Sequence, residues 1–127
     1  MFYPAQFWPH KNHINLVKAI KILKDRGIYV PLVLVGSKQE LWGEFERIEK
    51  FIEDNELNDL INILGYVDNN EINVLYHASE ALVIPTYLGP IQFPVIEAWK
   101  AGCPCLSSRA LGATEEMGDS VLFVTPD

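Results

Sequence analysis

The chain has 127 residues, 49% of them hydrophobic, and a formal net charge of −7. This length and composition suit one domain with its own core, while the acidic balance excludes broad binding to nucleic acid or anionic membranes, which requires a basic face. No apolar run approaches the roughly 20 residues of a membrane-spanning helix, and we expect no signal peptide ahead of the first predicted strand.

Short apolar runs alternate along the chain with segments whose apolar residues recur at helical spacing. Strands are expected at residues 2–7, 29–36, 60–65, 80–85, 104–108 and 120–124. Helices are expected at residues 12–27, 39–54 and 68–79 and from Pro94 onward, with a short helical turn at 114–117. Repeated strand–helix alternation is typical of α/β proteins. We therefore predict a Rossmann-like, doubly wound parallel sheet of about six strands with flanking helices.

Particular residues are expected to bound and bury two of these helices. Asn12 has a side chain suited to the N-cap of the first helix, and Gly27 suits its end. The second helix is expected to bury four residues at helical spacing: Leu41, Phe45, Ile48 and Ile52. Because the chain starts in a predicted strand and stops just after another, we expect residues 1–127 to be one domain of a longer protein.

Metal and nucleophile motifs are missing from the sequence. Cys103 and Cys105 lie in the stretch GCPC without a histidine nearby, so they are unsuited to a disulfide or a zinc site. We expect both to be buried, reduced thiols of a cytosolic protein. There is no P-loop, no G-x-G-x-x-G turn and no serine nucleophile elbow. A D-x-D pair that could hold Mg²⁺ at a strand end is missing too.

Ligands of a doubly wound sheet bind at the carboxyl ends of the strands, in the loops that lead to the following helices. The loops concerned are residues 6–12, 36–39, 65–69, 86–93 and 107–113. In the loop before Pro94, Gly89 permits backbone conformations that are closed to other residues. Pro94 suits the first helical position because it has no N–H. The free amides beyond it, with the positive end of the helix dipole, favour an anion.

Two charged residues beside these loops each have two interpretations. Glu97, one turn into the Pro94 helix, is either a carboxylate that stabilises the helix N-terminus or an acceptor for the two hydroxyls of a ribose beside a bound phosphate. Lys11 is either a solvated lysine or a point-charge partner of that phosphate. His10 and His13 are candidate general bases, but packing or a hydrogen bond to a loop carbonyl is the commoner role.

Five stretches of the chain carry a family resemblance when taken together. They are HKN, LVLVG, ILGYVDNNEINVLYHASEALVIPT, FPVIEAWKAGCPCLSS and GATEEMGDSVLFVTPD. Over its whole length the sequence resembles the C-terminal, donor-binding domain of a GT-B glycosyltransferase of family 4. The resemblance implies one half of a GT-B fold. It also implies sugar transfer from a nucleotide-diphosphate donor to an acceptor, with retention of anomeric configuration and without a metal or cofactor.

The resemblance also implies roles for particular residues. Lys11 would hold the diphosphate and Glu97 the ribose, and these are the two predicted catalytic residues. Residues 65–67 would border the base, near residues 36 and 37, and backbone amides in the loop before Pro94 would contact phosphate and sugar. The predicted donor-binding residues are Gln6, Gly36, Ser37, Gly65, Tyr66, Val67, Gly89, Ile91, Gln92 and Phe93.

The sequence departs from the family pattern at two positions. Gly89 stands eight positions before Glu97, where the family has a second glutamate that often contacts the donor sugar. Gln6 stands five positions before Lys11, where the family has an arginine. A neutral amide still donates to a phosphate oxygen but lacks the charge that roughly doubles the strength of such a bond. We hypothesise that this chain holds its donor differently, through Gln92 and Gln6.

An acceptor-binding N-terminal domain of the same chain is the implied partner, together with the nucleotide-sugar donor and no nucleic acid. Residues 1–127 would then bind the donor without turnover on their own. The enzyme would act in polysaccharide biosynthesis in the cytoplasm, at the inner face of the membrane through its other domain. Two alternatives stay open: a non-catalytic nucleotide-binding or interaction module of this fold, and another GT-B activity such as an epimerase or phosphorylase.

Overall fold

A computed structural model describes residues 1–39, 41–89, 93–110 and 117–127. Its strands are β1 (Phe2–Pro4), β2 (Leu32–Val35), β3 (Ile61–Gly65), β4 (Leu82–Ile84), β5 (Cys105–Ser108) and β6 (Leu122–Val124). Its α-helices are α1 (His13–Asp25), α2 (Glu44–Asp54), α3 (Asn69–Ala78) and α4 (Phe93–Lys100), and two 3₁₀ turns are η1 (Pro9–Lys11) and η2 (Gly118–Ser120). The predicted alternation of strands and helices is confirmed.

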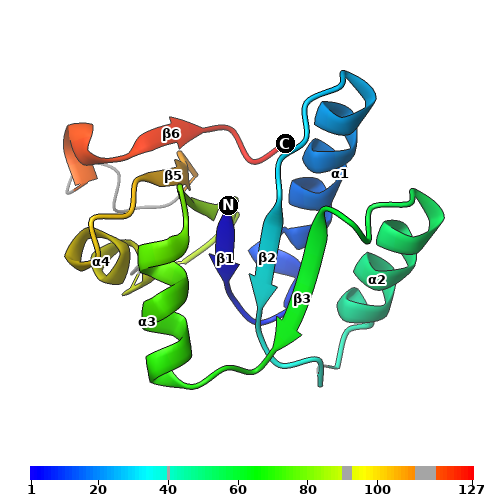
Figure 1. Ribbon diagram of the computed structural model, residues 1–127, viewed down its shortest axis with the longest axis horizontal. Coiled ribbons are helices and arrows are strands. Elements are labelled where there is room, and N and C mark those ends of the chain that lie inside the picture. Colours follow the sequence, from blue (N-terminus) through cyan, green and yellow to red (C-terminus); the bar gives the residue numbers. More distant parts are fainter. Residues whose placement is uncertain (40, 90–92, 111–116) are drawn as a thin grey trace.

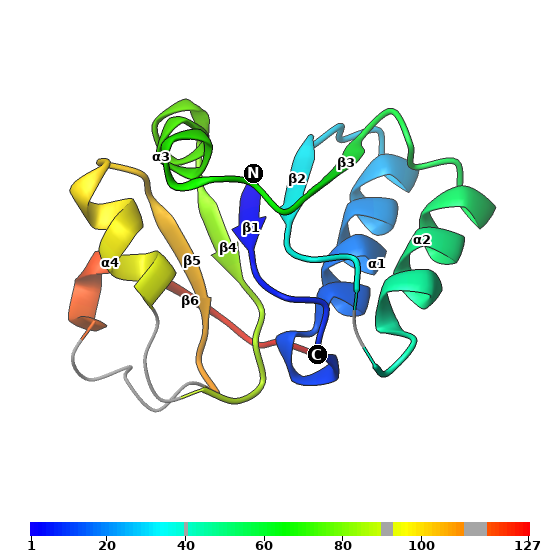
Figure 2. The same cartoon turned by 90° about the horizontal axis from the view of Figure 1, so that it is seen from below.

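The six strands form one parallel sheet in the order β3-β2-β1-β4-β5-β6. The first strand of the chain therefore lies in the middle of the sheet (Figure 1). Figure 2 shows α1 and α2 on one side of the sheet and α3 and α4 on the other. This is a doubly wound, Rossmann-like arrangement, so the predicted fold class is confirmed.

The register of the central strands is uneven. Three residue pairs align β1 with β2, and three align β4 with β5. A single pair, Phe2 with Leu82, aligns β1 with β4. The strands on either side of this junction are apolar on both faces, as expected for a parallel sheet that helices cover from both sides.

Consecutive residues of β1 point into opposite halves of the core. Phe2 is fully buried and meets the ring of Tyr76 from α3 at 5.1 Å between ring centroids. Tyr3 is also buried and meets the ring of His13 from α1 at 4.7 Å. The central strand thus packs against helices of both layers, which fixes where the loop that follows it begins.

The second predicted helix begins later than expected. Gly43 has a left-handed backbone with φ 70°, which an α-helix cannot contain, so α2 starts at Glu44. Leu41 lies before this break and is 92% exposed, which makes the prediction that it is buried wrong. The other three residues expected on the buried face, Phe45, Ile48 and Ile52, are buried.

The ends of the other helices follow the sequence only in part. Gly27 adopts φ 77° just after α1, as an end signal should. Asn12 occupies the N-cap position of α1, but its side chain makes no capping hydrogen bond; it binds two distant carbonyls instead. The predicted second strand is also shorter, since β2 begins at Leu32. In the described residues α4 begins at Phe93, one residue before Pro94, and the predicted turn at 114–117 lies largely outside them.

Candidate functional site

The connections that leave β1 and β4 run to opposite faces of the sheet, and a ligand crevice is expected at such a switch point. Here the two following loops are joined. The amide of Tyr87 donates to the carbonyl of His10 over 2.9 Å. The Tyr3 hydroxyl lies 2.9 Å from the carbonyl oxygen of Lys11 and 2.8 Å from Oγ1 of Thr86. The loop that contains Lys11 is therefore fixed to the start of the loop before α4.

The backbone of residues 6–12 turns tightly, and this turn fixes the position of Lys11. The amide of Trp8 donates to the Gln6 carbonyl over 2.7 Å, and the amide of Lys11 donates to the Trp8 carbonyl over 2.9 Å. Asn12 then adopts φ 61°. The Lys11 side chain is half-buried, and this burial lowers its pKa. A bound anion would relieve that cost by pairing with the charge.

The two histidines beside Lys11 differ in their surroundings: His10 is half-buried, with its ring centroid 5.6 Å from that of Trp8. His13 is buried between the rings of Tyr3 and Phe7, with centroid distances of 4.7 and 4.6 Å. No hydrogen bond of normal geometry joins its ring nitrogens to the described residues. Burial lowers the pKa of His13 to about 3; the Ala5 backbone acts in the opposite direction, and the charge of Lys11 adds to the lowering. His13 is therefore a packing residue and has no access to act as a general base.

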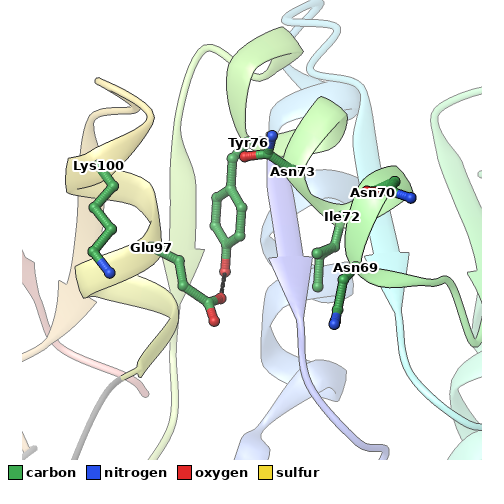
Figure 3. Close-up of a pocket in the computed structure, with 7 residues that line it drawn as sticks. All are labelled: Asn69, Asn70, Ile72, Asn73, Tyr76, Glu97 and Lys100. Carbon is green, nitrogen blue, oxygen red and sulfur yellow. Dashed lines mark hydrogen bonds between the residues drawn. The ribbon is translucent and has the colours of Figure 1, made fainter.

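Glu97 lies on α4 with its carboxylate near α3. Its Oε2 accepts a hydrogen bond of 2.7 Å from the hydroxyl of Tyr76 (Figure 3). Glu97 is nevertheless exposed, and it opens into a pocket of about 390 Å³. That pocket is lined by Asn69, Asn70, Ile72, Asn73, Tyr76, Glu97 and Lys100. The carboxylate is thus held by one protein group while space for a ligand remains beside it.

A second pocket, of about 340 Å³, lies at the carboxyl ends of β1, β2 and β3. It is lined by Pro4, Ala5, Gln6, Val35, Gly36, Tyr66, Val67, Asn69 and Ile72. Four of the predicted donor-binding residues are among these. Asn69 and Ile72 line both pockets, so the two hollows adjoin along the first turns of α3 and together reach from Tyr66 and Val67 to Glu97.

Backbone geometry explains two of the glycines in this region. A Cβ atom on Gly36 would lie 2.2 Å from the carbonyl oxygen of Ala5, so no larger residue fits where β2 ends. Gly65 adopts φ 78° at the end of β3, a conformation that favours glycine. Its carbonyl accepts from the amide of Gly36 over 3.0 Å. These glycines bring the two strand ends together under the second pocket.

Other predicted donor-binding residues lie around the pockets. Ser37 is linked to the second pocket because its amide donates to Oε1 of Gln6 over 3.0 Å. That bond leaves the amide nitrogen of Gln6 as the group able to donate to a phosphate. Gly89 is half-buried and Phe93 is exposed at the start of α4. Ile91 and Gln92 lie outside the described residues, and so does the proposed contact of Gln92.

Residues 1–127 match the protein family described as Glycosyl transferases group 1. The chain belongs to this family. It is 29% identical over 120 residues to the O-antigen chain mannosyltransferase RfbU of Salmonella typhimurium, covering 94% of this chain and 32% of that protein. It thus spans about a third of the length of such relatives.

Solved structures of similar fold agree with this family assignment. The sucrose-phosphate synthase of Thermosynechococcus elongatus is 28% identical, with a TM-score of 0.82 over 99% of this chain and 32% of that one. HepE of Anabaena, solved in complex with UDP-glucose, is 20% identical, with a TM-score of 0.83 over 98% of this chain and 34% of that one. The resemblance to glycosyltransferases found in the sequence is confirmed at the level of the family and the fold.

The residues of this glycosyltransferase-family chain that sequence reasoning missed lie on α3. Asn69, Ile72, Asn73 and Tyr76 recur at the spacing of one helix face and form the wall of the first pocket opposite α4. The signal was present, because two amides and a tyrosine on one face of a helix are unusual for plain core packing. The sequence could not predict which helix would lie opposite this face of α3.

The described residues contain no cluster of metal ligands, no membrane-spanning helix and no cysteine pair. Within residues 1–39, 41–89, 93–110 and 117–127, no three His, Cys, Asp or Glu side chains are grouped so that they could hold a metal ion. In that same part of the chain no helix has the length and apolar character needed to cross a bilayer. Cys103 and Cys105 are free and buried, as expected from the sequence.

Proposed function

We propose that this domain binds a nucleotide-diphosphate sugar and forms the donor half of a glycosyltransferase. The observation that carries the proposal is that the two pockets adjoin at the carboxyl edge of the sheet. They connect Tyr66 and Val67 to the accessible carboxylate of Glu97. Ligands of doubly wound sheets bind at this edge. An acidic domain can hold an anionic ligand there only through local groups, and in this proposal Lys11 is one of them.

In this proposal the parts of the donor are distributed over the two adjoining pockets. The base would lie in the pocket lined by Gln6, Tyr66 and Val67. The ribose would reach Glu97, whose carboxylate is an acceptor able to bind two neighbouring hydroxyls. The diphosphate would lie toward Lys11 and the N-terminus of α4. The cost of burying Lys11 would then be offset by the phosphate charge.

The domain would contribute to the reaction by positioning the donor and stabilising charge. As the sugar departs, negative charge grows on the nucleoside diphosphate. Lys11 and the positive end of the α4 dipole are suited to stabilise that charge without reorganisation. We propose that they allow transfer without a metal and with retention of configuration. The acceptor would be held by an N-terminal domain, so residues 1–127 alone would bind without transferring sugar.

The relatives support a nucleotide-sugar donor and a glycan product. One structural relative carries UDP-glucose, and one sequence relative is an O-antigen chain mannosyltransferase. We extend both features to this chain as classes: a nucleoside diphosphate sugar as donor and a growing polysaccharide as acceptor. The cytoplasm, at the inner face of the membrane, is the location we expect for such an enzyme.

Calorimetric titration of the 127-residue chain with UDP, GDP and ADP tests the proposal. One of the three should bind in preference to the others. Lys11→Ala and Glu97→Ala should each weaken that binding by about tenfold or more, as expected when a hydrogen bond to a charged group is lost.

Two exposed residues of matching charge provide the controls. Lys18→Ala on α1 and Glu49→Ala on α2 lie away from both pockets and should leave the affinity unchanged. Equal indifference of the parent chain to all three nucleotides would contradict the proposal and favour a non-catalytic module of the same fold.

A further inference from the structure

A hydrogen bond between a buried and an exposed side chain crosses from α3 to α4. The hydroxyl of Tyr76 donates to Oε2 of Glu97 over 2.7 Å. Tyr76 is only 2% exposed, whereas Glu97 is exposed. Figure 3 shows the ring extending from α3 and the carboxylate from α4, with the tyrosine hydroxyl next to a carboxylate oxygen. The donor is thus part of the core and the acceptor part of the surface.

The tyrosine ring is fixed by its packing. It stands edge-on to the ring of Phe2, with centroids 5.1 Å apart and planes at 82°. Phe2 itself belongs to β1 and is fully buried. Burial, and then the bond to Glu97, raise the pKa of the Tyr76 hydroxyl, so it keeps its proton and acts toward the carboxylate as a donor.

For Glu97, the bond to Tyr76 is the one side-chain hydrogen bond made within the described part of the chain. A long exposed side chain samples many rotamers, and a ligand that binds it must overcome that freedom. A fixed donor on Oε2 restricts the carboxylate to one orientation before any ligand arrives. Oε1 and the remaining lone pairs of Oε2 stay available on the side of the pocket. Such preorganisation strengthens binding only to groups that fit the chosen orientation.

We propose that Tyr76 is a positioning residue that aims the Glu97 carboxylate at the ribose hydroxyls and so determines how strongly the site prefers a ribose to a deoxyribose. This inference rests on the proposed function, because it requires a nucleotide beside Glu97. It assigns to Tyr76 no contact with the donor.

Binding of ribose and deoxyribose nucleotides by the 127-residue chain tests the inference. The best-bound of UDP, GDP and ADP is titrated calorimetrically together with its 2′-deoxy and 3′-deoxy analogues. The parent chain should prefer the ribonucleotide by about tenfold or more, because each missing hydroxyl removes a hydrogen bond to a carboxylate. Tyr76→Phe keeps the ring packed against Phe2 and removes only the hydroxyl. It should reduce the preference at least threefold.

Two further variants separate positioning from loss of stability. Tyr3→Phe removes another buried tyrosine hydroxyl, one that bonds to Lys11 and Thr86 rather than to Glu97. It can weaken binding of all the nucleotides but should leave the ratio between ribose and deoxyribose forms unchanged. In a Glu97→Gln background the Tyr76→Phe change should have no further effect on that ratio.

The outcomes distinguish the inference from the function on which it rests. If the parent chain binds none of the nucleotides, the proposed function fails and the inference fails with it. If the parent prefers ribose and Tyr76→Phe prefers it equally, the function stands and the inference is overturned. It is also overturned if Tyr76→Phe weakens all the analogues in proportion, because that result marks a merely structural hydrogen bond.

Discussion

His13 is enclosed by two aromatic rings, and this enclosure makes the stability of the fold sensitive to acid. Its pKa is lowered by burial to about 3, against about 6.5 in an unfolded chain. Between these two values the unfolded state binds a proton that the folded state does not. The contribution of a neutral His13 to stability is therefore complete above pH 6.5 and is lost as the pH falls toward 3.

Replacing His13 with Phe should remove this dependence. The free energy of unfolding of the parent chain should fall faster on acidification than that of His13→Phe, by up to about 1.4 kcal/mol for each pH unit below 6.5. Urea unfolding at pH 7.5, 5.5 and 4.5 measures the difference. His77→Phe, at an exposed position on α3, should keep the parental slope. A His13→Phe chain with the parental slope would show that the ring is protonated in place.

Single residues also show what could be anticipated from the sequence. Lys11 and Glu97 are predicted from the sequence because their types and places match a family pattern, and their roles stay predictions. Gly36 was named for the same reason, but the close approach of Ala5 that requires it joins separate strands. Tyr76 was not named at all, because its partner is 21 positions away on another helix. Roles that depend on a contact between elements need the fold.

At the scale of elements, the start of α3 decides where both pockets end. Asp68 Oδ1 accepts hydrogen bonds from the amides of Asn70 and Glu71 over 2.8 and 2.9 Å. In return, Oε2 of Glu71 accepts from the Asp68 amide over 2.9 Å. This capping box stabilises the first turn of the helix. The same turn carries Asn69, which lines both pockets.

Loss of this cap should affect stability and binding together. Asp68→Ala should lower the free energy of unfolding by about 1 kcal/mol and weaken nucleotide binding, because the wall shared by the pockets would fray. Chemical denaturation and calorimetry measure the two effects. Asp59→Ala, an exposed acidic residue in the turn before β3, is the matched control and should change neither. A stable Asp68→Ala chain with parental affinity would contradict the link.

The limits of pattern reading are also clear at this scale. The six strands lie within the predicted ranges, although each is shorter than predicted. They could be predicted because short apolar runs are typical of the strands of a parallel sheet. The start of α2 was misplaced because Leu41 continues the apolar spacing of the helix. Gly43 interrupts it with a backbone conformation that the spacing does not reveal. The prediction that the Asn12 side chain caps α1 is wrong for a different reason. That side chain instead donates hydrogen bonds to carbonyls far away in the sequence.

Over the whole molecule, Asn12 connects three distant segments. Its Nδ2 donates to the carbonyl of Pro85 over 3.0 Å and to that of Pro126 over 2.6 Å. The first carbonyl belongs to the residue that follows β4, and the second lies among the last residues described. Asn12 itself is buried, so these carbonyls have little access to water at that point. One amide thus holds the Lys11 loop, the loop toward α4 and the last residues together.

Asn12→Ala should therefore cost about 1–3 kcal/mol of unfolding free energy, because buried carbonyls lose their donor. It should also weaken nucleotide binding, since Lys11 would no longer be fixed to the switch point. Asn15→Ala is the control. Its amide bonds are more exposed, and removing them should change stability by less than about 0.5 kcal/mol. Equal effects of the two substitutions would contradict the special position of Asn12.

The single aligned pair between β1 and β4 gives the domain a mechanical seam. On either side of it lies a half-sheet of three strands, and the ladders within each half are longer than the seam between them. A donor bound across the crevice would contact both half-sheets and hold them together. Binding of the donor would then restrict the motion of the two half-sheets relative to each other, and release of the nucleotide would allow that motion again.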